Sequence, residues 1–245
     1  MYDISTAKIL FEEAEKLQLH PEWLTDYGLF SFQQDSQEKY CFYNTSILNS
    51  HLSIYLAKNK HATRVILGRH NLKNIDYCLP KSLVEAKRFL EEHQKIVLKP
   101  TQGRRSEGVH LINLVEELEG LSIENSILEK YILGKEYRYL ILNGEVLAVH
   151  QRVYDTPINT TEDVKRISFA KADWNKETVA VAIKTAAVMG LQLAAVDFLV
   201  AEKGEAFILE VNSAPGIYHF HFPSEGPAIN AGKLILIASL AQFHT

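Results

Sequence analysis

Two short apolar segments near the end of the chain each contain an acidic residue. Residues 194–200 read AAVDFLV and residues 206–212 read AFILEVN, separated by a short polar connection. This pattern predicts a β-hairpin, and because side chains alternate along a strand, Glu210 and Asn212 should share one face. Asp197 lies in an otherwise apolar run, so a buried carboxylate there needs a partner. Three oxygen ligands on one face would suit Mg²⁺; the alternative is that each carboxylate pairs with a lysine or with backbone donors.

A second candidate site is a glycine-containing segment between two apolar stretches. Residues 96–109 read IVLKPTQGRRSEGV. Gly103 and Gly108 have the spacing of a P-loop, but Val109 follows where that motif has a lysine at the start of a helix. The segment is therefore expected to be a hairpin tip whose backbone N–H groups bind phosphate. Lys99 precedes it and could pair with phosphate oxygens; the alternative is an edge strand whose lysine reaches solvent.

The third candidate is a segment that could bind a nucleoside. Residues 127–138 read ILEKYILGKEYR. A purine base needs a backbone donor, a backbone acceptor and apolar contacts, and a strand through Glu129 to Ile132 could supply all three, with Gly134 as a pivot. Glu136 could then bind the ribose hydroxyls.

Two arginines follow on successive predicted strands, Arg138 and Arg152. Arginine is the preferred residue for phosphate and for a charged acyl-phosphate. The alternative for each, taken singly, is an ordinary surface ion pair.

Composition and charge narrow the class of protein. The 245 residues are 47% hydrophobic and 23% charged, which fits one large domain or one two-lobed unit. A net charge of −4 gives no general attraction to nucleic acid or to an anionic membrane. No apolar run approaches the roughly 18 residues that cross a bilayer, and the first residues lack the features of a signal peptide. The two cysteines, Cys41 and Cys78, are not in a CxxC motif, so we expect a cytoplasmic protein with free thiols.

Helices and short strands alternate along the chain. Helices are expected at residues 4–19, 45–57, from 61 onward, 82–93, 178–189 and 228–243. Strands are expected at residues 28–32, 40–43, 96–99, 109–112, 126–132, 137–142 and 146–151, followed by the hairpin. The order predicts an α+β fold with antiparallel hairpins rather than a repeat of βαβ units.

These residues, in this order, resemble the ATP-grasp superfamily of carboxylate–amine ligases over about residues 45–226. The ATP-grasp domains of cyanophycin synthetase and of the bifunctional glutathione synthetases are the most similar. The resemblance implies two α+β lobes whose antiparallel sheets clamp ATP between them. We expect a shortened N-terminal segment at 1–58, a small lobe with a phosphate lid at 59–133, and a large lobe with a metal site at 134–245.

The resemblance also assigns roles to individual residues. Thr45 and Ser46, and then residues 57–63 with Asn59 in the place of an aspartate, look like a family motif that ends in a nucleotide-binding lysine. The nucleotide-binding set would be Lys60, Lys99, Gly103, Ser106, Gly108, Glu129, Tyr131, Ile132 and Glu136. The metal ligands would be Asp197, Glu210 and Asn212, and the catalytic residues Arg138, Arg152 and Asn212.

Three residues depart from the family pattern, one in the lid and two beside the acyl site. Ser106 stands where the lid often has a glycine. Tyr218 and Phe220 stand where cyanophycin synthetases have polar residues beside the acyl site, which predicts a less charged acid.

The implied activity is ATP-dependent ligation of a carboxylic acid to an amine, through an acyl-phosphate, with ADP and phosphate as products. The cofactors would be ATP and one or two Mg²⁺, with Mn²⁺ as a substitute. The partners would be small molecules, such as an amino acid or a peptide, with no nucleic acid and no membrane, and a homodimer is one option. Two alternatives stay open: an ATP-binding module without ligase turnover, and an ATP-dependent phosphotransferase on the same fold.

Overall fold

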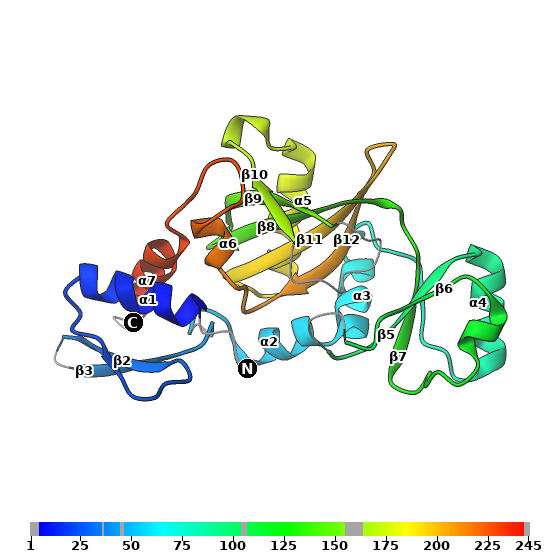
Figure 1. Cartoon of the computed structure of the whole chain (residues 1–245), viewed down its shortest axis with the longest axis horizontal. Coiled ribbons are helices and arrows are strands. Elements are labelled where there is room, and N and C mark those ends of the chain that lie inside the picture. Colours follow the sequence, from blue (N-terminus) through cyan, green and yellow to red (C-terminus); the bar gives the residue numbers. More distant parts are fainter. Residues whose placement is uncertain (1–4, 36, 45–46, 104–106, 155–163, 243–245) are drawn as a thin grey trace.

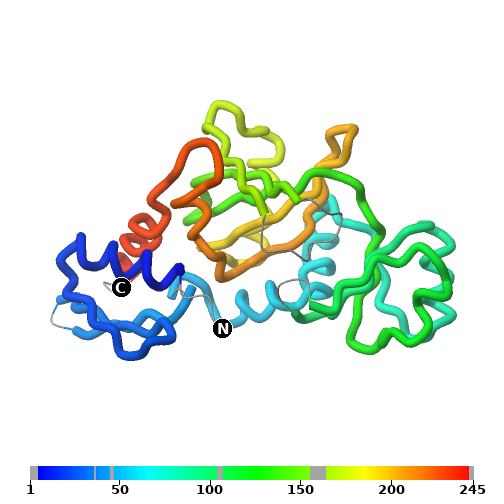
Figure 2. Tube along the Cα trace, in the orientation of Figure 1, coloured from blue at the N-terminus to red at the C-terminus, as the bar shows by residue number. Residues whose placement is uncertain are grey.

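The computed structural model describes residues 5–35, 37–44, 47–103, 107–154 and 164–242. Three groups of elements lie in a row, with a five-stranded sheet in the centre (Figures 1 and 2). The N-terminal elements and the last helix lie at one end, and a four-stranded sheet with one helix lies at the other.

The central sheet carries the predicted hairpin. Its strands run in the order β10-β9-β8-β11-β12, and every neighbouring pair is antiparallel. The bounds are β8 (Gly134–Leu142), β9 (Glu145–Val153), β10 (Lys165–Ser168), β11 (Leu193–Ala201) and β12 (Ala206–Asn212). Helix α5 (Lys176–Val188) covers one face, where Ile141, Phe198 and Ala186 belong to one buried core. A short 3-10 helix, η2 (Lys171–Asp173), precedes α5.

The opposite face of this sheet is apolar at one end and polar at the other. Leu140, Leu142 and Ala148 pack into a second core with the N-terminal elements and α7 (Ala231–Gln242). The N-terminal elements are α1 (Ser5–Lys16), β1 (Glu22–Trp23), β2 (Leu29–Gln34) and β3 (Gln37–Phe42). Phe220 of the short α6 (Tyr218–His221) belongs to the same core. The first and last parts of the chain are thus tied to the central sheet.

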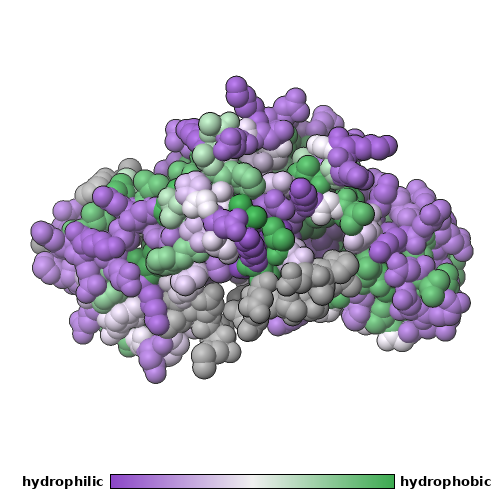
Figure 3. Space-filling model, turned by 45° about the horizontal axis from the view of Figure 1, so that its top comes forward, coloured by the Kyte–Doolittle hydropathy of each residue, from purple (hydrophilic) through white to green (hydrophobic). Residues whose placement is uncertain are grey.

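The third group, which we call the α4 lobe, spans residues 77–130. Its sheet runs β4-β7-β5-β6, with β4 (Tyr77–Cys78), β5 (Ile96–Pro100), β6 (His110–Ile112) and β7 (Ser126–Lys130). Helix α4 (Leu83–His93) buries Ala86, Phe89 and Leu90 against it, and the 3-10 helix η1 (Val115–Leu118) follows β6. Hydrophilic side chains cover much of the outer surface of this lobe in the view of Figure 3.

Two helices, α2 (His51–Lys58) and α3 (Lys60–Arg69), connect the N-terminal part to the α4 lobe. Asn59 separates them, and its side chain accepts a hydrogen bond from the Ala62 amide, so the asparagine serves as the N-cap of α3. Leu67 of α3 packs into the core on the α5 side of the central sheet. The lobe boundaries predicted at residues 58 and 133 stay a prediction. Helix α3, which was assigned to the small lobe, shares a core with the central sheet.

Several predicted bounds shift for local reasons. The helix expected from residue 45 begins at His51, because Ser50 accepts a hydrogen bond from the Ser53 amide and caps it. The last helix begins at Ala231 rather than 228. Short elements were missed: β1, β4, β10, α6 and the two 3-10 helices.

Candidate active site

The register of the hairpin places the three predicted metal ligands on one face. Asp197 lies opposite Glu210, and Asn212 lies opposite Ala195, two residues before Asp197. A register shift between Asp197 and Phe198 leaves Leu209 without a partner on β11. This bulge keeps Glu210 beside Asp197 while Ile208 turns into the core on the α5 side.

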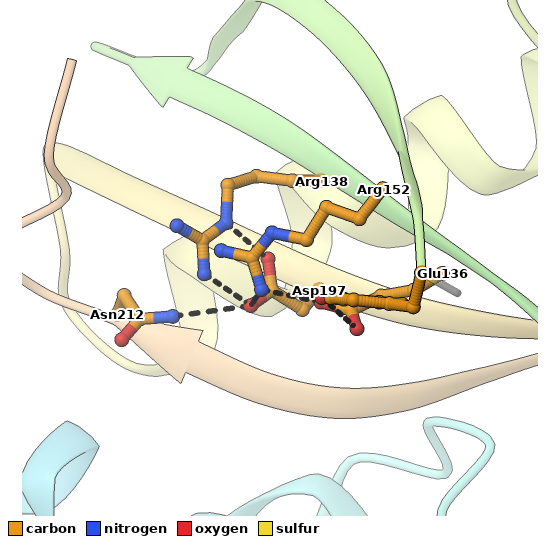
Figure 4. Close-up of polar contacts among 6 residues, drawn as sticks. Glu136, Arg138, Arg152, Asp197 and Asn212 are labelled. Atoms are coloured by element: carbon orange, nitrogen blue, oxygen red, sulfur yellow. Dashed lines mark hydrogen bonds and ion pairs between the residues drawn. The ribbon is translucent and has the colours of Figure 1, made fainter. Parts of the chain in front are cut away.

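Two arginines from neighbouring strands hold Asp197 (Figure 4). Arg138, directly opposite on β8, donates from Nε to Oδ1 at 2.6 Å and from Nη2 to Oδ2 at 2.5 Å. The Arg152 Nη1 atom on β9 lies 3.7 Å from Asp197 Oδ2. From the other side, Asn212 Nδ2 donates to the same oxygen at 3.3 Å. The buried carboxylate thus has the partners it needs.

Glu136 lies within the same network. Its carboxylate accepts hydrogen bonds from Arg152 Nη1 at 2.5 Å and from the Tyr154 hydroxyl at 2.7 Å. Arg152 therefore joins Glu136 to Asp197. A ribose-binding role for Glu136 stays a prediction, and in this structure the carboxylate orients Arg152.

A second buried ion cluster lies where β5 and β7 of the α4 lobe meet α3. The Glu129 carboxylate accepts from Lys99 Nζ at 2.7 Å and from Arg64 Nε at 3.0 Å, and all three side chains are buried. Burial alone would raise the pKa of Glu129, but Lys99 and Arg64 outweigh it and lower that pKa to about 2. Glu129 is thus a fixed anion that orients the predicted phosphate lysine.

Arg64 links the α4 lobe to the central sheet, and it was missed from the sequence. Its Nη1 atom donates to the Ile208 carbonyl at 2.6 Å and its Nη2 atom to the Leu209 carbonyl at 2.8 Å. These carbonyls lie at the bulge beside Glu210. One signal was present: Arg64 follows Lys60 by four residues, so the two share one face of α3.

The charges of Lys60 and Glu210 each affect the pKa of the other residue. Burial lowers the pKa of Lys60, as does the nearby Lys99, against the opposing effect of Glu210. Burial also raises the pKa of Glu210, and the charge of Asp197 adds to this, against Arg138, Lys60 and Lys99. Lys60 opens α3, where a cation opposes the helix dipole, so its place calls for an anion nearby.

The predicted phosphate segment is described only at its ends. Ser106 and its two preceding residues lie outside the described residues, as do Thr45 and Ser46. Gly108 has φ +68° and a Cβ there would meet Pro100 at 3.0 Å, which explains the glycine. Gly134 is explained by close packing, because a Cβ would lie 2.5 Å from the Val200 carbonyl oxygen.

Of the predicted adenine residues, Glu129 lies on β7, and Tyr131 and Ile132 follow its end. The Tyr131 amide donates to the Lys95 carbonyl at 3.0 Å, and Lys95 lies over the Tyr131 ring. This amide is therefore already bonded. The adenine assignments for Glu129, Tyr131 and Ile132 stay predictions.

Phe220 corrects one expectation about the substrate. The ring is 1% exposed and stacks on His150 with a centroid distance of 4.4 Å. It packs into the core around α6 and α7 and does not line an open pocket. The expectation of a less charged acid loses this support.

The donor set at the hairpin suits Mg²⁺ chemically. Within the described ranges no group of three or more His, Cys, Asp or Glu residues is placed to hold a metal ion. The predicted set has two carboxylates and one amide, which are hard oxygen donors of the kind that Mg²⁺ takes beside water and phosphate. Burial raises the pKa of Glu210 and the charge of the adjacent Asp197 adds to this, so a cation between the two carboxylates would relieve their repulsion.

Comparison with known proteins identifies the family. The model of the RimK-like ATP-grasp domain matches residues 57–235. The chain belongs to this family. Both the superfamily and the ATP-grasp fold expected from the sequence are thereby confirmed. ATP-grasp ligases use ATP and Mg²⁺. In the described part, no helix is both long and apolar enough to span a membrane.

Several named ligases are similar to this ATP-grasp chain. It is 28% identical over 182 residues to the coenzyme gamma-F420-2:alpha-L-glutamate ligase of Methanococcus maripaludis, covering 69% of this chain and 62% of that protein. It is 28% identical over 177 residues to a D-alanine–D-alanine ligase of Fusobacterium nucleatum, covering 66% and 61%. The chain spans about three fifths of the length of these relatives. The bifunctional glutathione synthetase from Pasteurella multocida has the same fold, with a TM-score of 0.71 and 15% identity, covering 97% of this chain and 43% of that one.

Proposed function

We propose that this chain joins a carboxylic acid to an amine at the expense of ATP, through an acyl-phosphate, releasing ADP and phosphate. The family and its named ligase relatives support this reaction class. An amino acid or a peptide is the substrate class most in keeping with them.

One observation carries the proposal: a single row across the central sheet combines an acidic pair with arginine. His150, Arg138, Asp197 and Glu210 are directly opposite one another on β9, β8, β11 and β12. Phosphoryl transfer needs positioning and neutralisation of charge rather than a nucleophilic side chain. Such a row offers anionic groups for a metal beside cations for phosphate and acyl oxygens.

The residue roles follow from this arrangement. Asp197, Glu210 and Asn212 would hold Mg²⁺, or Mn²⁺ in its place, and the ion would neutralise phosphate charge. Lys60 and Lys99 approach Glu210 from the side of α3 and the α4 lobe and would bind phosphate oxygens. Arg138 now occupies both oxygens of Asp197, so in the working state it must turn from that carboxylate. Its guanidinium would then be available to the acyl-phosphate.

The test is Mg²⁺·ATP-dependent release of ADP, measured with acids alone, with amines alone, and with both. A ligase requires the acid, and hydroxylamine as the amine should yield an acyl hydroxamate. Asp197→Asn should lose this activity, whereas Lys73→Gln, in an exposed ion pair with Glu205, should retain it. Binding of ATP without ADP release under any combination would instead indicate a binding module. A stable phosphorylated acid formed without an amine would indicate a phosphotransferase.

A further inference from the structure

Within the described part of the chain, three buried polar atoms on the polar face of the central sheet have no hydrogen-bond partner. They are Nδ1 and Nε2 of His150 and Nε of Arg152. His150 and Arg152 are two residues apart on β9, so their side chains leave the same face. Buried polar atoms normally form hydrogen bonds, so the lack of partners at these three atoms needs an explanation. A bound ligand would explain it, because His150 is 2% exposed and, among the described residues, its ring stacks on Phe220 without forming a hydrogen bond.

The same place has excess positive charge. Arg166 lies opposite Arg152 on β10, and its guanidinium makes one hydrogen bond within the described part of the chain, from Nη1 to the Val164 carbonyl at 2.7 Å. Burial lowers the pKa of Arg166 to about 10, and the charges of Arg152 and Arg138 add to this. Asp197 and Glu136 neutralise Arg138 and Arg152, respectively. Among the described residues, no carboxylate forms an ion pair with Arg166. A bound anion would therefore compensate the charge of Arg166.

The position of Arg166 is fixed by its backbone. Ser224 donates its amide to the Arg166 carbonyl at 2.9 Å, and the Arg166 amide donates to Ser224 Oγ at 3.1 Å. The next residues, Glu225 and Gly226, continue along β10, where a Cβ on Gly226 would lie 2.0 Å from the Ser168 carbonyl oxygen. The segment of residues 223–226 thus holds the edge strand that presents Arg166.

We propose that the acid substrate carries a second anionic group, which Arg166 binds together with Arg152 and the imidazole of His150. This inference rests on the proposed function, because it places the second anion beside the row where the first carboxylate would be activated. Arg152 Nε and one ring N–H of His150 would donate to that anion, which would satisfy two of the three atoms that lack partners. A monoanionic acid would leave the partly buried Arg166 without a counter-charge, and such a loss discriminates between substrates.

The test uses pairs of acids that differ only in the second charge: glutarate with its monoamide, and N-acetylglutamate with N-acetylglutamine. Binding is measured by calorimetry with Mg²⁺ and a non-hydrolysable ATP analogue, so it does not depend on turnover. The diacid should bind roughly 10- to 100-fold more tightly than its monoamide, as expected for charge-assisted hydrogen bonds. Arg166→Gln should remove this preference. Lys165→Gln is the matched control, because Lys165 is exposed on the same strand and pairs with Glu225 instead.

Stability separates a binding role from a structural one. Arg166→Gln should have the same melting temperature as the wild type or a higher one, because it removes a partly buried cation close to two others. Equal binding of diacid and monoamide, or an equal loss of both in Arg166→Gln, would overturn the inference. Diacid binding that depends on Arg166 without any hydroxamate formation would uphold the inference and contradict the ligase activity.

Discussion

Glu129→Gln is expected to destabilise the protein strongly, because Glu129 neutralises two buried cations at once. Its oxygens lie 2.7 Å from Lys99 Nζ and 2.9 Å from Arg64 Nη2. The neutral amide leaves both cations without a counter-charge and turns an N–H₂ donor toward one of them. The shape of the side chain is otherwise kept, so loss of charge is the main change.

The magnitude can be worked out in two ways that agree. The fall of the pKa of Glu129 from 4.5 to about 2 corresponds to about 3 kcal/mol of stability at neutral pH. Removing one partner of a buried ion pair costs about 3–5 kcal/mol. We therefore expect the free energy of unfolding at pH 7 to fall by about 3 kcal/mol.

The assay is urea unfolding of the wild type and of Glu129→Gln. Glu205→Gln is the control, because Glu205 forms an ion pair of similar length with Lys73 at the surface, and no measurable change is expected. Because the folded pKa of Glu129 is depressed, its contribution is present above pH 4.5 and is lost as the pH falls toward 2. The difference between wild type and Glu129→Gln should therefore shrink over that window.

A variant as stable as the wild type at pH 7 would refute this account of the cluster. A difference that stays constant from pH 7 to pH 3 would also refute it, since the loss would then not come from the charge. Combining Glu129→Gln with Lys99→Met should cost less than the sum of the two changes, because the second removes a cation that the first has left unpaired.

Three further predictions concern stability. Asn49→Ala should cost about 3 kcal/mol in urea unfolding, because the buried Asn49 amide makes four backbone hydrogen bonds, three with Gln192 and Leu193 at the start of β11 and one with Ser213 after β12. A loss below about 0.5 kcal/mol would contradict it. Gly226→Ala should lower the melting temperature far more than Gly204→Ala. Both glycines have positive φ, but only Gly226 lies against a backbone carbonyl. Equal decreases in melting temperature would show that φ alone matters. Burial and the charges of Arg138, Arg152, Arg166 and His219 lower the pKa of His150 to about 2. The free energy of unfolding should therefore decline as the pH falls below about 6.5, where the unfolded histidine takes up a proton, and His150→Phe should flatten that decline. Parallel pH profiles of the wild type and the variant would rule this out.

Local patterns were enough to predict the elements that carry the metal set. Alternation over residues 206–212 predicted that Glu210 and Asn212 share a face, and the register agrees. The pattern of residues 82–93 predicted a helix, and α4 covers all but the first of them, with Ala86, Phe89 and Leu90 buried. Both features depend on neighbours within a few residues, which a single sequence displays.

The missed residues depend on contacts between distant parts of the chain. Arg64 donates hydrogen bonds to the Glu129 carboxylate and to the Ile208 carbonyl, which are separated from it by 65 and 144 residues in the sequence. No local pattern encodes such pairing. The bulge at Leu209 breaks the alternation that strand prediction assumes. Arg166 lies on a four-residue strand whose partner segment, residues 223–226, comes much later in the chain. Phe220 was assigned to the pocket because the sequence does not show that His150 covers it.

The most direct test of the central claim is transfer of ¹⁸O from a labelled carboxylic acid to phosphate during turnover with Mg²⁺, ATP and an amine. Activation through an acyl-phosphate leaves one carboxylate oxygen on the released phosphate. The account predicts one ¹⁸O atom in each phosphate produced, together with one amide product. Release of ADP with unlabelled phosphate, in the presence of any acid that stimulates it, would contradict the account.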